Sequence, residues 1–441
     1  MKSGKRLKIL VMVAIAMTVT AMAVAQAGQF KVLHEFRGNF DGAAPTDAVI
    51  QDSNGNLYGT TIGGGLINGP CAPLGCGTVF EVSPNGSGGW TMKTLHRFGR
   101  GSDGERPSGA LVMDGAGNIF GTTEYGGRVG CGSTCGAIFE LSPSGGGWAE
   151  STIFSFDGHA GGSSPSGLLQ DANGNLYGTT GQGGSGYAGA GFGVAYELSP
   201  GTGGVWTETV LHTFTQTDGA GPNSTLYMDS KGNLLGTAVE GGVVTGKCKT
   251  FGGCGTVFEL SPGSGGEWSF SEYSIPAPGK GIWPTGGVRE DGAGNLFGVT
   301  SYCGQYSSGV VFKLSPATGG GWTESAIHLF DGAEGANPVG LIEDGNGGFY
   351  GSTLGGANGA CNFGCGLVFD LTPGPNGGWV ERILHRFSGF YDGGNANRLF
   401  VDGNGNIFGT TEAGGNTKGG SVCSDGCGVV FEITAPAPVE R

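Results

Sequence analysis

Cysteine is the residue type in this chain whose spacing most directly suggests chemistry. Ten of the 11 cysteines form five pairs separated by four to six residues, and a glycine follows the second cysteine of each pair. A structural zinc site needs four ligands, whereas each pair offers two thiols and no nearby histidine. In a chain with an export signal, described below, we therefore expect five local disulfides and no metal or other cofactor. The expected disulfides are Cys71–Cys76, Cys131–Cys135, Cys248–Cys254, Cys361–Cys365 and Cys423–Cys427.

One cysteine, Cys303, has no partner at the matching spacing, because its repeat unit carries Ser308 there. We expect Cys303 to be a buried, inert free thiol. Pairing with a second chain is the alternative.

Three carboxylates, Glu124, Glu240 and Glu412, follow a repeated threonine-rich phrase. A pair of carboxylates about 5 to 10 Å apart is the requirement for glycoside hydrolysis. Their recurrence at one position of the repeat instead favours a structural role or a diffuse acidic surface. The sequence also lacks a nucleophile elbow, a phosphate loop, a dinucleotide fingerprint and a metal-binding helix. We therefore expect a binding module more than an enzyme.

Aromatic residues that break the repeat pattern are the other candidates for a binding site. Rings beside Asp, Asn and Thr suit recognition of a glycan or a peptide, and the alternative is that they pack the long loops. The candidate binding residues are Glu124, Tyr125, Tyr187, Phe251, Trp283, Tyr302, Tyr306 and Phe363.

These residues lie within a tandem repeat. The phrase Asn56-Leu-Tyr-Gly-Thr-Thr61 and its variants occur seven times, with a mean period of about 58 residues. Its copies start at Asn56, Asn118, Asn175, Asn233, Asn295, Gly348 and Asn406. In the first unit the β-type segments are Asp47–Asp52, Asn56–Thr61, Thr78–Ser83 and Trp90–Phe98, divided by turn residues. Four antiparallel strands repeated seven times predict an all-β, seven-bladed β-propeller.

The two ends of the repeat array favour a closed ring over a linear solenoid. The last unit stops after a third strand, Val429–Thr434, and lacks a fourth. The segment Phe30–Phe36 matches the fourth-strand phrase Thr94–Phe98. We therefore expect the N-terminal strand to complete the last blade and to leave no open sheet edge.

The phrase Asp-x-x-Gly-Asn-Leu-Tyr-Gly-Thr-Thr, followed by Gly-Gly and Val-Phe-Glu-Leu-Ser-Pro, resembles the GloVer (Gloeo/Verruco) tandem repeat from Phe30 to Thr434. The resemblance implies an exported bacterial protein at the cell surface or secreted, and it implies no established activity. Members carry varied C-terminal anchors, whereas this chain ends without a recognisable one.

Other repeated residues are expected to be structural. The Asp52–Asn56 segments predict turns, with calcium loops as the alternative. One fourth-strand position carries five histidines and, in two units, Ser155 and Ser274. Six tryptophans open the same strand and are expected to pack between blades. The histidines are His34, His96, His212, His328 and His385, and the tryptophans are Trp90, Trp148, Trp206, Trp268, Trp322 and Trp379.

The N-terminus predicts a secretory signal peptide, because a basic segment precedes an apolar run and a small-residue cleavage pattern ending at Ala25. We expect a signal peptide over residues 1–25, a propeller over 26–434 and a disordered tail over 435–441. Loss of the four basic residues in the signal peptide changes the net charge from −14 to −18, which argues against nucleic acid as a partner. The mature chain is expected to be a secreted or extracellular monomer, with the periplasm as the alternative, and not to insert into a membrane.

The loops between second and third strands and those between blades should emerge on one face, which carries the disulfides. We expect this face to bind a polysaccharide or a surface protein. The alternatives are a carbohydrate-active hydrolase or lyase with its site over the central channel, and a structural envelope component.

Overall fold

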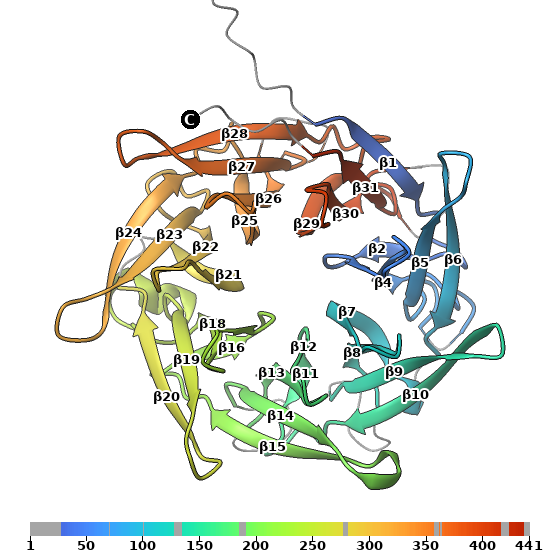
Figure 1. Ribbon diagram of the computed structural model, residues 1–441, viewed down its shortest axis with the longest axis horizontal. Coiled ribbons are helices and arrows are strands. Elements are labelled where there is room, and N and C mark those ends of the chain that lie inside the picture. The colour runs from blue at the N-terminus through green and yellow to red at the C-terminus, as the bar shows by residue number, and fades with distance from the viewer. Residues whose placement is uncertain are drawn as a thin grey trace, which may run out of the picture.

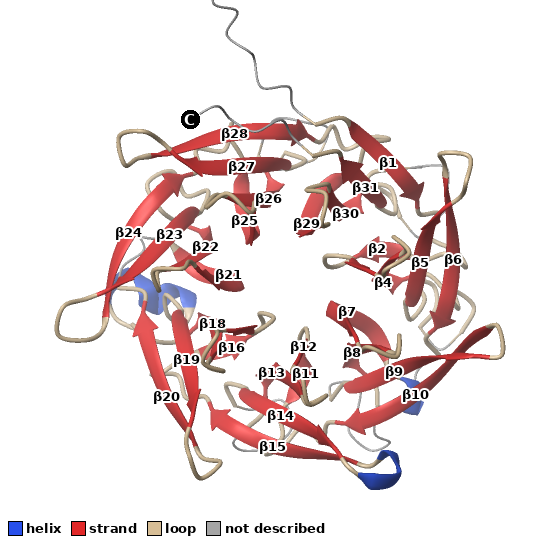
Figure 2. Cartoon of the chain, viewed as in Figure 1, coloured by secondary structure: helices blue, strands red, loops and turns tan. Residues whose placement is uncertain are grey.

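The computed structural model describes residues 28–69, 71–99, 101–127, 135–184, 191–276, 281–356, 361, 364–415 and 423–435. Seven sheets surround a central axis, so the chain is a seven-bladed β-propeller as expected (Figure 1). Strands dominate the described residues (Figure 2), beside the short 3-10 helices η1 (Gly101–Asp103), η2 (Thr202–Gly204) and η3 (Gly246–Phe251). The expected signal peptide and all of the expected tail after residue 435 lie outside the described residues.

Each blade is an antiparallel sheet whose first strand lines the channel and whose fourth strand forms the outer rim. Blade 1 contains β2 (Ala43–Pro45), β3 (Ile50–Gln51), β4 (Leu57–Gly63), β5 (Thr78–Pro84) and β6 (Trp90–Arg97). Blade 2 contains β7 (Glu105–Met113), β8 (Ile119–Tyr125), β9 (Ala137–Ser144) and β10 (Gly147–Ser155). Blade 3 contains β11 (Ser163–Pro165), β12 (Leu169–Gln170), β13 (Leu176–Gln182), β14 (Val194–Pro200) and β15 (Trp206–Thr213).

The remaining blades repeat this plan. Blade 4 contains β16 (Ala220–Pro222), β17 (Tyr227–Met228), β18 (Leu234–Glu240), β19 (Thr256–Pro262) and β20 (Trp268–Ser274). Blade 5 contains β21 (Ile282–Glu290), β22 (Leu296–Tyr302), β23 (Val310–Pro316) and β24 (Trp322–Leu329). Blade 6 contains β25 (Ala336–Glu343), β26 (Phe349–Gly355), β27 (Leu367–Pro373) and β28 (Trp379–Arg386). Blade 7 contains β29 (Gly394–Val401), β30 (Ile407–Ala413), β31 (Val429–Ile433) and the N-terminal β1 (Phe30–Glu35).

The ring closes at its rim through β1, as the sequence predicts. Strand β1 pairs antiparallel with β31, so that Phe30 lies opposite Ile433 and Val32 opposite Phe431. The Phe30 ring also stacks on His385 of blade 6, with 3.7 Å between ring centroids. The N-terminal strand therefore packs against two blades, with its side chains half-buried except for the exposed Lys31.

A second closure, which the sequence did not predict, lies at the channel wall. The Arg398 guanidinium of blade 7 donates two hydrogen bonds to the Asp47 carboxylate of blade 1, one of them 2.8 Å long from Nε. The Asn397 amide donates to the Pro45 carbonyl at 2.7 Å, and Thr410 donates to the Asp47 carbonyl.

The glycine of the repeated phrase is required by the ring in the next strand. A Cβ atom at Gly59 would lie 2.5 Å from the buried Phe80 ring on β5, and the other blades repeat this contact. The strand-three rings and the strand-two aliphatic residues then pack into clusters between neighbouring blades, as Phe36 and Phe80 do with Phe408 of blade 7. Burial between blades, not within one sheet, holds the fold together.

The fourth-strand histidines are structural, although the predicted position was wrong in two blades. His96 pairs with Val79, and the equivalent residues in blades 2 and 4 are Phe154 and Tyr273, not Ser155 and Ser274. A β-bulge at Leu95, and at the equivalent residue of every blade except blade 4, adds one residue to the fourth strand; β20 lacks it.

The histidines contact the inter-blade links. The Nε2 atoms of His96, His212 and His385 lie 2.9 to 3.2 Å from the carboxylates of Asp103, Asp218 and Asp392. These aspartates belong to the Asp-Gly turns that follow the strand, so the two repeated residue types form one structural unit.

The repeated tryptophans pack between blades, as expected. Trp148 meets Tyr58 of blade 1 edge to face at 6.1 Å, and Trp206 meets Phe120 of blade 2 at 6.0 Å. The Asp52–Asn56 segment forms the predicted turn: Asp52 Oδ1 accepts the backbone N–H groups of Asn54 and Asn56 at 2.8 and 2.9 Å.

Candidate functional site

In each blade, the second residue of the first strand has a left-handed backbone and lies at the disulfide face. Six of these seven residues are not glycine, and their φ angles lie between 51° and 60°. We call this set the mouth ring; it consists of Ala44, Arg106, Ser164, Gly221, Trp283, Asn337 and Asn395. Left-handed backbone disfavours any residue with a Cβ atom, and a bulky residue such as Trp283 most of all.

The same backbone hydrogen bond in every blade holds the mouth ring in place. The backbone N–H of each ring residue donates to a carbonyl in the preceding blade, at 2.8 to 3.3 Å. In five blades that carbonyl belongs to the second cysteine of the loop; Cys76, for example, accepts from Arg106 at 2.8 Å. In blades 3 and 5 the accepting carbonyls belong to Phe192 and Ser308. The disulfide loops thus anchor a backbone of fixed shape that presents varied side chains.

The expected disulfides form where both cysteines are described: Cys71–Cys76, Cys248–Cys254, Cys361–Cys365 and Cys423–Cys427. Cys131, the expected partner of Cys135, lies outside the described residues.

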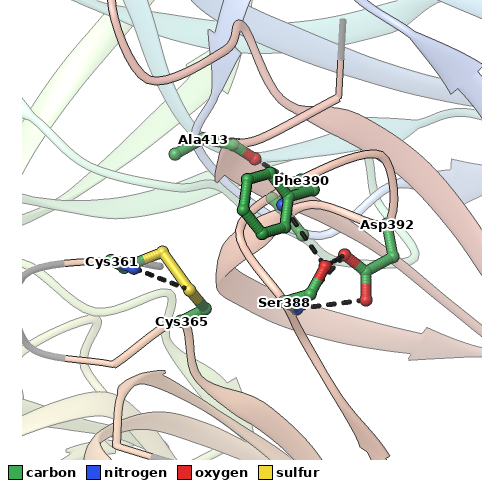
Figure 3. The surroundings of a disulfide bond; sticks show 7 residues. Cys361, Cys365, Ser388, Phe390, Asp392 and Ala413 are labelled. Atoms are coloured by element: carbon green, nitrogen blue, oxygen red, sulfur yellow. Dashed lines mark hydrogen bonds between the residues drawn. A yellow bond between two sulfur atoms is a disulfide. The ribbon is translucent and has the colours of Figure 1, made fainter. Parts of the chain in front are cut away.

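The Cys361–Cys365 bridge lies beside the Ser388–Asp392 turn that leads into blade 7 (Figure 3), so both kinds of loop share this face. No described disulfide includes Cys303, which is partly exposed instead of buried.

A hollow of about 640 Å³ opens on the disulfide face over blades 7, 1 and 2. Its walls include three mouth-ring residues, Ala44, Arg106 and Asn395. They also include Tyr125 and the carboxylates of Glu105, Glu412 and Asp425. The hollow combines one guanidinium with three carboxylates and an aromatic ring.

Tyr125 is held between two charged groups. Its side-chain hydrogen bond with Glu124 is the main cause that raises its pKa above the ordinary value. The Arg106 guanidinium lies 5.3 Å from the centre of its ring, in cation–π contact. The ring therefore has a fixed position at the wall of the hollow.

A second group of predicted residues meets across blades 4 and 5. Trp283 of the mouth ring stacks on Tyr302 at 5.7 Å, and Phe251 of η3 meets Trp283 edge to face at 5.8 Å. Phe251 and Trp283 also pack against the Cys248–Cys254 disulfide. Tyr302 is 38% exposed and Tyr306 in the following loop is 52% exposed. This aromatic cluster is thus partly packed and partly open to solvent.

The structure separates residues that the sequence grouped. Glu124 and Tyr125 lie on blade 2, away from the aromatic cluster of blades 4 and 5. Glu240 does not share the position of Glu124 and Glu412: it pairs with Ala220, as Tyr125 pairs with Glu105 and Ala413 with Gly394. It therefore lies one residue later and beside Gly252. Tyr187 and Phe363 lie outside the described residues.

The mouth ring was not predicted from the sequence, although a signal was present. Six of the seven ring residues precede a proline, as in Arg106-Pro107 and Trp283-Pro284, and Asn395 precedes Ala396. A variable residue before a repeated proline marks a fixed backbone with a free choice of side chain.

No helix among the described residues is long and apolar enough to cross a membrane.

The model of the Gloeobacter/Verrucomicrobia repeat matches residues 18–251, 133–324 and 284–437, and the chain belongs to this family. No curated protein matches the chain.

Solved structures show the same fold at low sequence identity. An ulvan lyase of polysaccharide lyase family PL25 is 11% identical over 92% of this chain and 98% of its own, with a TM-score of 0.55. An ancestral GH74 enzyme is 12% identical over 91% of this chain and 49% of its own, with a TM-score of 0.54. The extracellular domain of a putative one-component system from B. thetaiotaomicron is 11% identical over 94% of this chain and 42% of its own, with a TM-score of 0.50. At these identities the likeness extends to the fold alone.

Proposed function

We propose that the chain is an exported, non-catalytic binding module that recognises a polysaccharide through the mouth ring and the hollow on its disulfide face. The observation that carries this proposal is the composition of the ring. A chain with 98 glycines keeps six other residues where glycine would be unstrained. Each of these residues carries backbone strain on the order of 1 kcal/mol, and their side chains vary from blade to blade.

The chemistry of these side chains suits a sugar. Trp283 and Tyr302 offer ring faces for the apolar faces of pyranoses, and the mouth-ring asparagine and serine side chains carry hydrogen-bonding groups. The hollow holds more carboxylates than cations, which disfavours a strongly anionic glycan. A neutral polysaccharide is the ligand class that fits both features.

Affinity electrophoresis and glycan arrays test the proposal. We expect retention by at least one neutral polysaccharide, and a loss of about tenfold or more, near 1.4 kcal/mol, in Trp283→Gly and in Arg106→Gly. Val205→Ala, an exposed change on the opposite face, is the matched control and should bind as the wild type does. Binding to an envelope protein with no glycan retained would contradict the proposed ligand class.

A carbohydrate-active enzyme is the second candidate, because Glu412 and Asp425 are exposed carboxylates in the same hollow. In that case the protein would release reducing ends or unsaturated products from a polysaccharide, and Glu412→Gln would abolish the release. Retained binding without any chain cleavage would favour the binding module.

A further inference from the structure

At the outer rim, the contact between blades 5 and 6 is chemically incomplete. Along the rim, the fourth-strand ring of one blade faces a side chain of the next blade's fourth strand. His212 stacks on Phe270, and His385 stacks on Phe30, each with 3.7 Å between ring centroids. Between blades 5 and 6 the facing residue is Glu381, which brings a carboxylate to His328.

Each of these two polar groups has one unsatisfied atom. His328 Nε2 and Glu381 Oε1 are 3.8 Å apart, and both atoms are buried without a hydrogen-bond partner. Their side chains are only 14% and 8% exposed. Burial raises the pKa of Glu381 to about 8 and lowers the pKa of His328, so desolvation works against the charged form of each group.

In blade 5 the aspartate of the Asp-Gly turn is Asp331, and it accepts hydrogen bonds from its own turn instead of bonding His328 Nε2. Asp331 Oδ1 accepts the backbone N–H groups of Ala333 and Glu334 at 2.8 and 2.9 Å. That turn places the Glu334 carboxylate beside the pair, so that one ligand atom from each of His328, Glu334 and Glu381 lies within 4.8 Å of the others. Arg386 is the nearby cation, and it donates to the Ala333 carbonyl at 2.6 Å.

We propose that His328, Glu334 and Glu381 bind a divalent transition-metal ion, Zn²⁺ in the first instance, which joins blades 5 and 6 at the rim. One imidazole and two carboxylates with a water molecule complete a tetrahedral set. Bond lengths of about 2.0 to 2.2 Å require the three ligand atoms to move closer together than they lie here. Calcium and magnesium require six or more oxygen ligands, which these side chains do not provide. The ion adds a directly bound positive charge to the buried carboxylate.

The rim also supplies internal comparisons. His96, Asp103 and Glu150 form a similar group between blades 1 and 2, but there His96 Nε2 already bonds Asp103 at 2.9 Å. This second group needs no ion to satisfy its histidine. Glu381→Phe would reproduce the stacked arrangement of His212 on Phe270 and is expected to fold.

Titration calorimetry and equilibrium dialysis of tag-free protein with ZnCl₂ test the proposal. We expect one tight site per chain, with affinity at least about tenfold lower in Glu381→Gln and in His328→Gln. Glu150→Gln should retain the site. Zn²⁺ should raise the melting temperature of the wild type but not that of Glu381→Phe. Unchanged affinity and stoichiometry in Glu381→Gln and in folded Glu381→Phe would overturn the assignment.

Discussion

The outer rim and the mouth ring use the same seven-fold repeat in opposite ways. At the rim, side chains recur from blade to blade and make the same contacts, as Trp148 and Trp206 do with rings of the preceding blade. At the mouth, the backbone recurs and the side chains differ, from Ala44 to Arg106 to Trp283. Repeated side chains therefore mark packing between blades, and a repeated backbone with varied side chains marks the surface that meets a partner.

The largest effect should follow removal of the rim strand that closes the ring. Deletion of residues 26–37 exposes the edge of β31 and removes Phe30 from its contacts with His385 and Phe431. The deletion also removes the fully buried Phe36, whose loss alone costs about 3 to 5 kcal/mol, so we expect it to lower the melting temperature sharply or to prevent folding. Deletion of residues 436–441 is the control, and circular dichroism melts make the measurement. An unchanged melt of the first deletion would contradict rim closure.

A smaller effect at the rim should depend on pH. Burial, and then the Asp157 charge, raises the pKa of Glu208 to about 7 from an ordinary 4.5, and its Oε1 atom is buried without a hydrogen-bond partner. Between these values the folded chain holds a proton that the unfolded chain has released, so stability falls as the pH rises from 4.5 through 7.

Glu208→Gln should therefore raise the free energy of unfolding by on the order of 1 to 3 kcal/mol at pH 8 and leave it nearly unchanged at pH 4. Urea unfolding at both pH values measures this difference. Glu267→Gln, at an exposed position, should show no such dependence. An equal gain at both pH values would rule out ionisation of Glu208 as the cause.

The smallest effect on stability should occur at the mouth, where binding is expected to change instead. Asn395→Gly relieves a φ of 60° but adds freedom to the unfolded chain, so the two effects nearly cancel. The free energy of unfolding should change by less than about 1 kcal/mol. Binding to the polysaccharide identified for the wild type should weaken.

The matched change is Gly393→Ala, because Gly393 also has positive φ and a Cβ atom there would lie 2.4 Å from the Thr411 hydroxyl oxygen. It should destabilise the fold by 1 kcal/mol or more. If Asn395→Gly were as damaging as Gly393→Ala, the mouth ring would be structural, like the rim.

The fold, the closing strand and the disulfide pairs could be predicted because each depends on a short phrase and its spacing. Cys71 and Cys76 are near neighbours in the chain, and Phe30–Phe36 carries the same pattern as Thr94–Phe98. The candidate site was predicted only in part. Trp283 and Tyr302 were identified as rings that break the repeat, but their stacking across the blade was not.

By itself the sequence determined the number of blades, their strand order and the face that carries the disulfides, because local hydrophobic alternation and turn residues repeat seven times. The tertiary structure alone decided the rest. The Arg398–Asp47 closure joins residues 351 positions apart, and the absence from β20 of the bulge that Leu95 forms in blade 1 makes Tyr273 the equivalent of His96. The left-handed φ of Arg106 depends on a hydrogen bond to the carbonyl of Cys76 in another blade. Such features depend on contacts between blades.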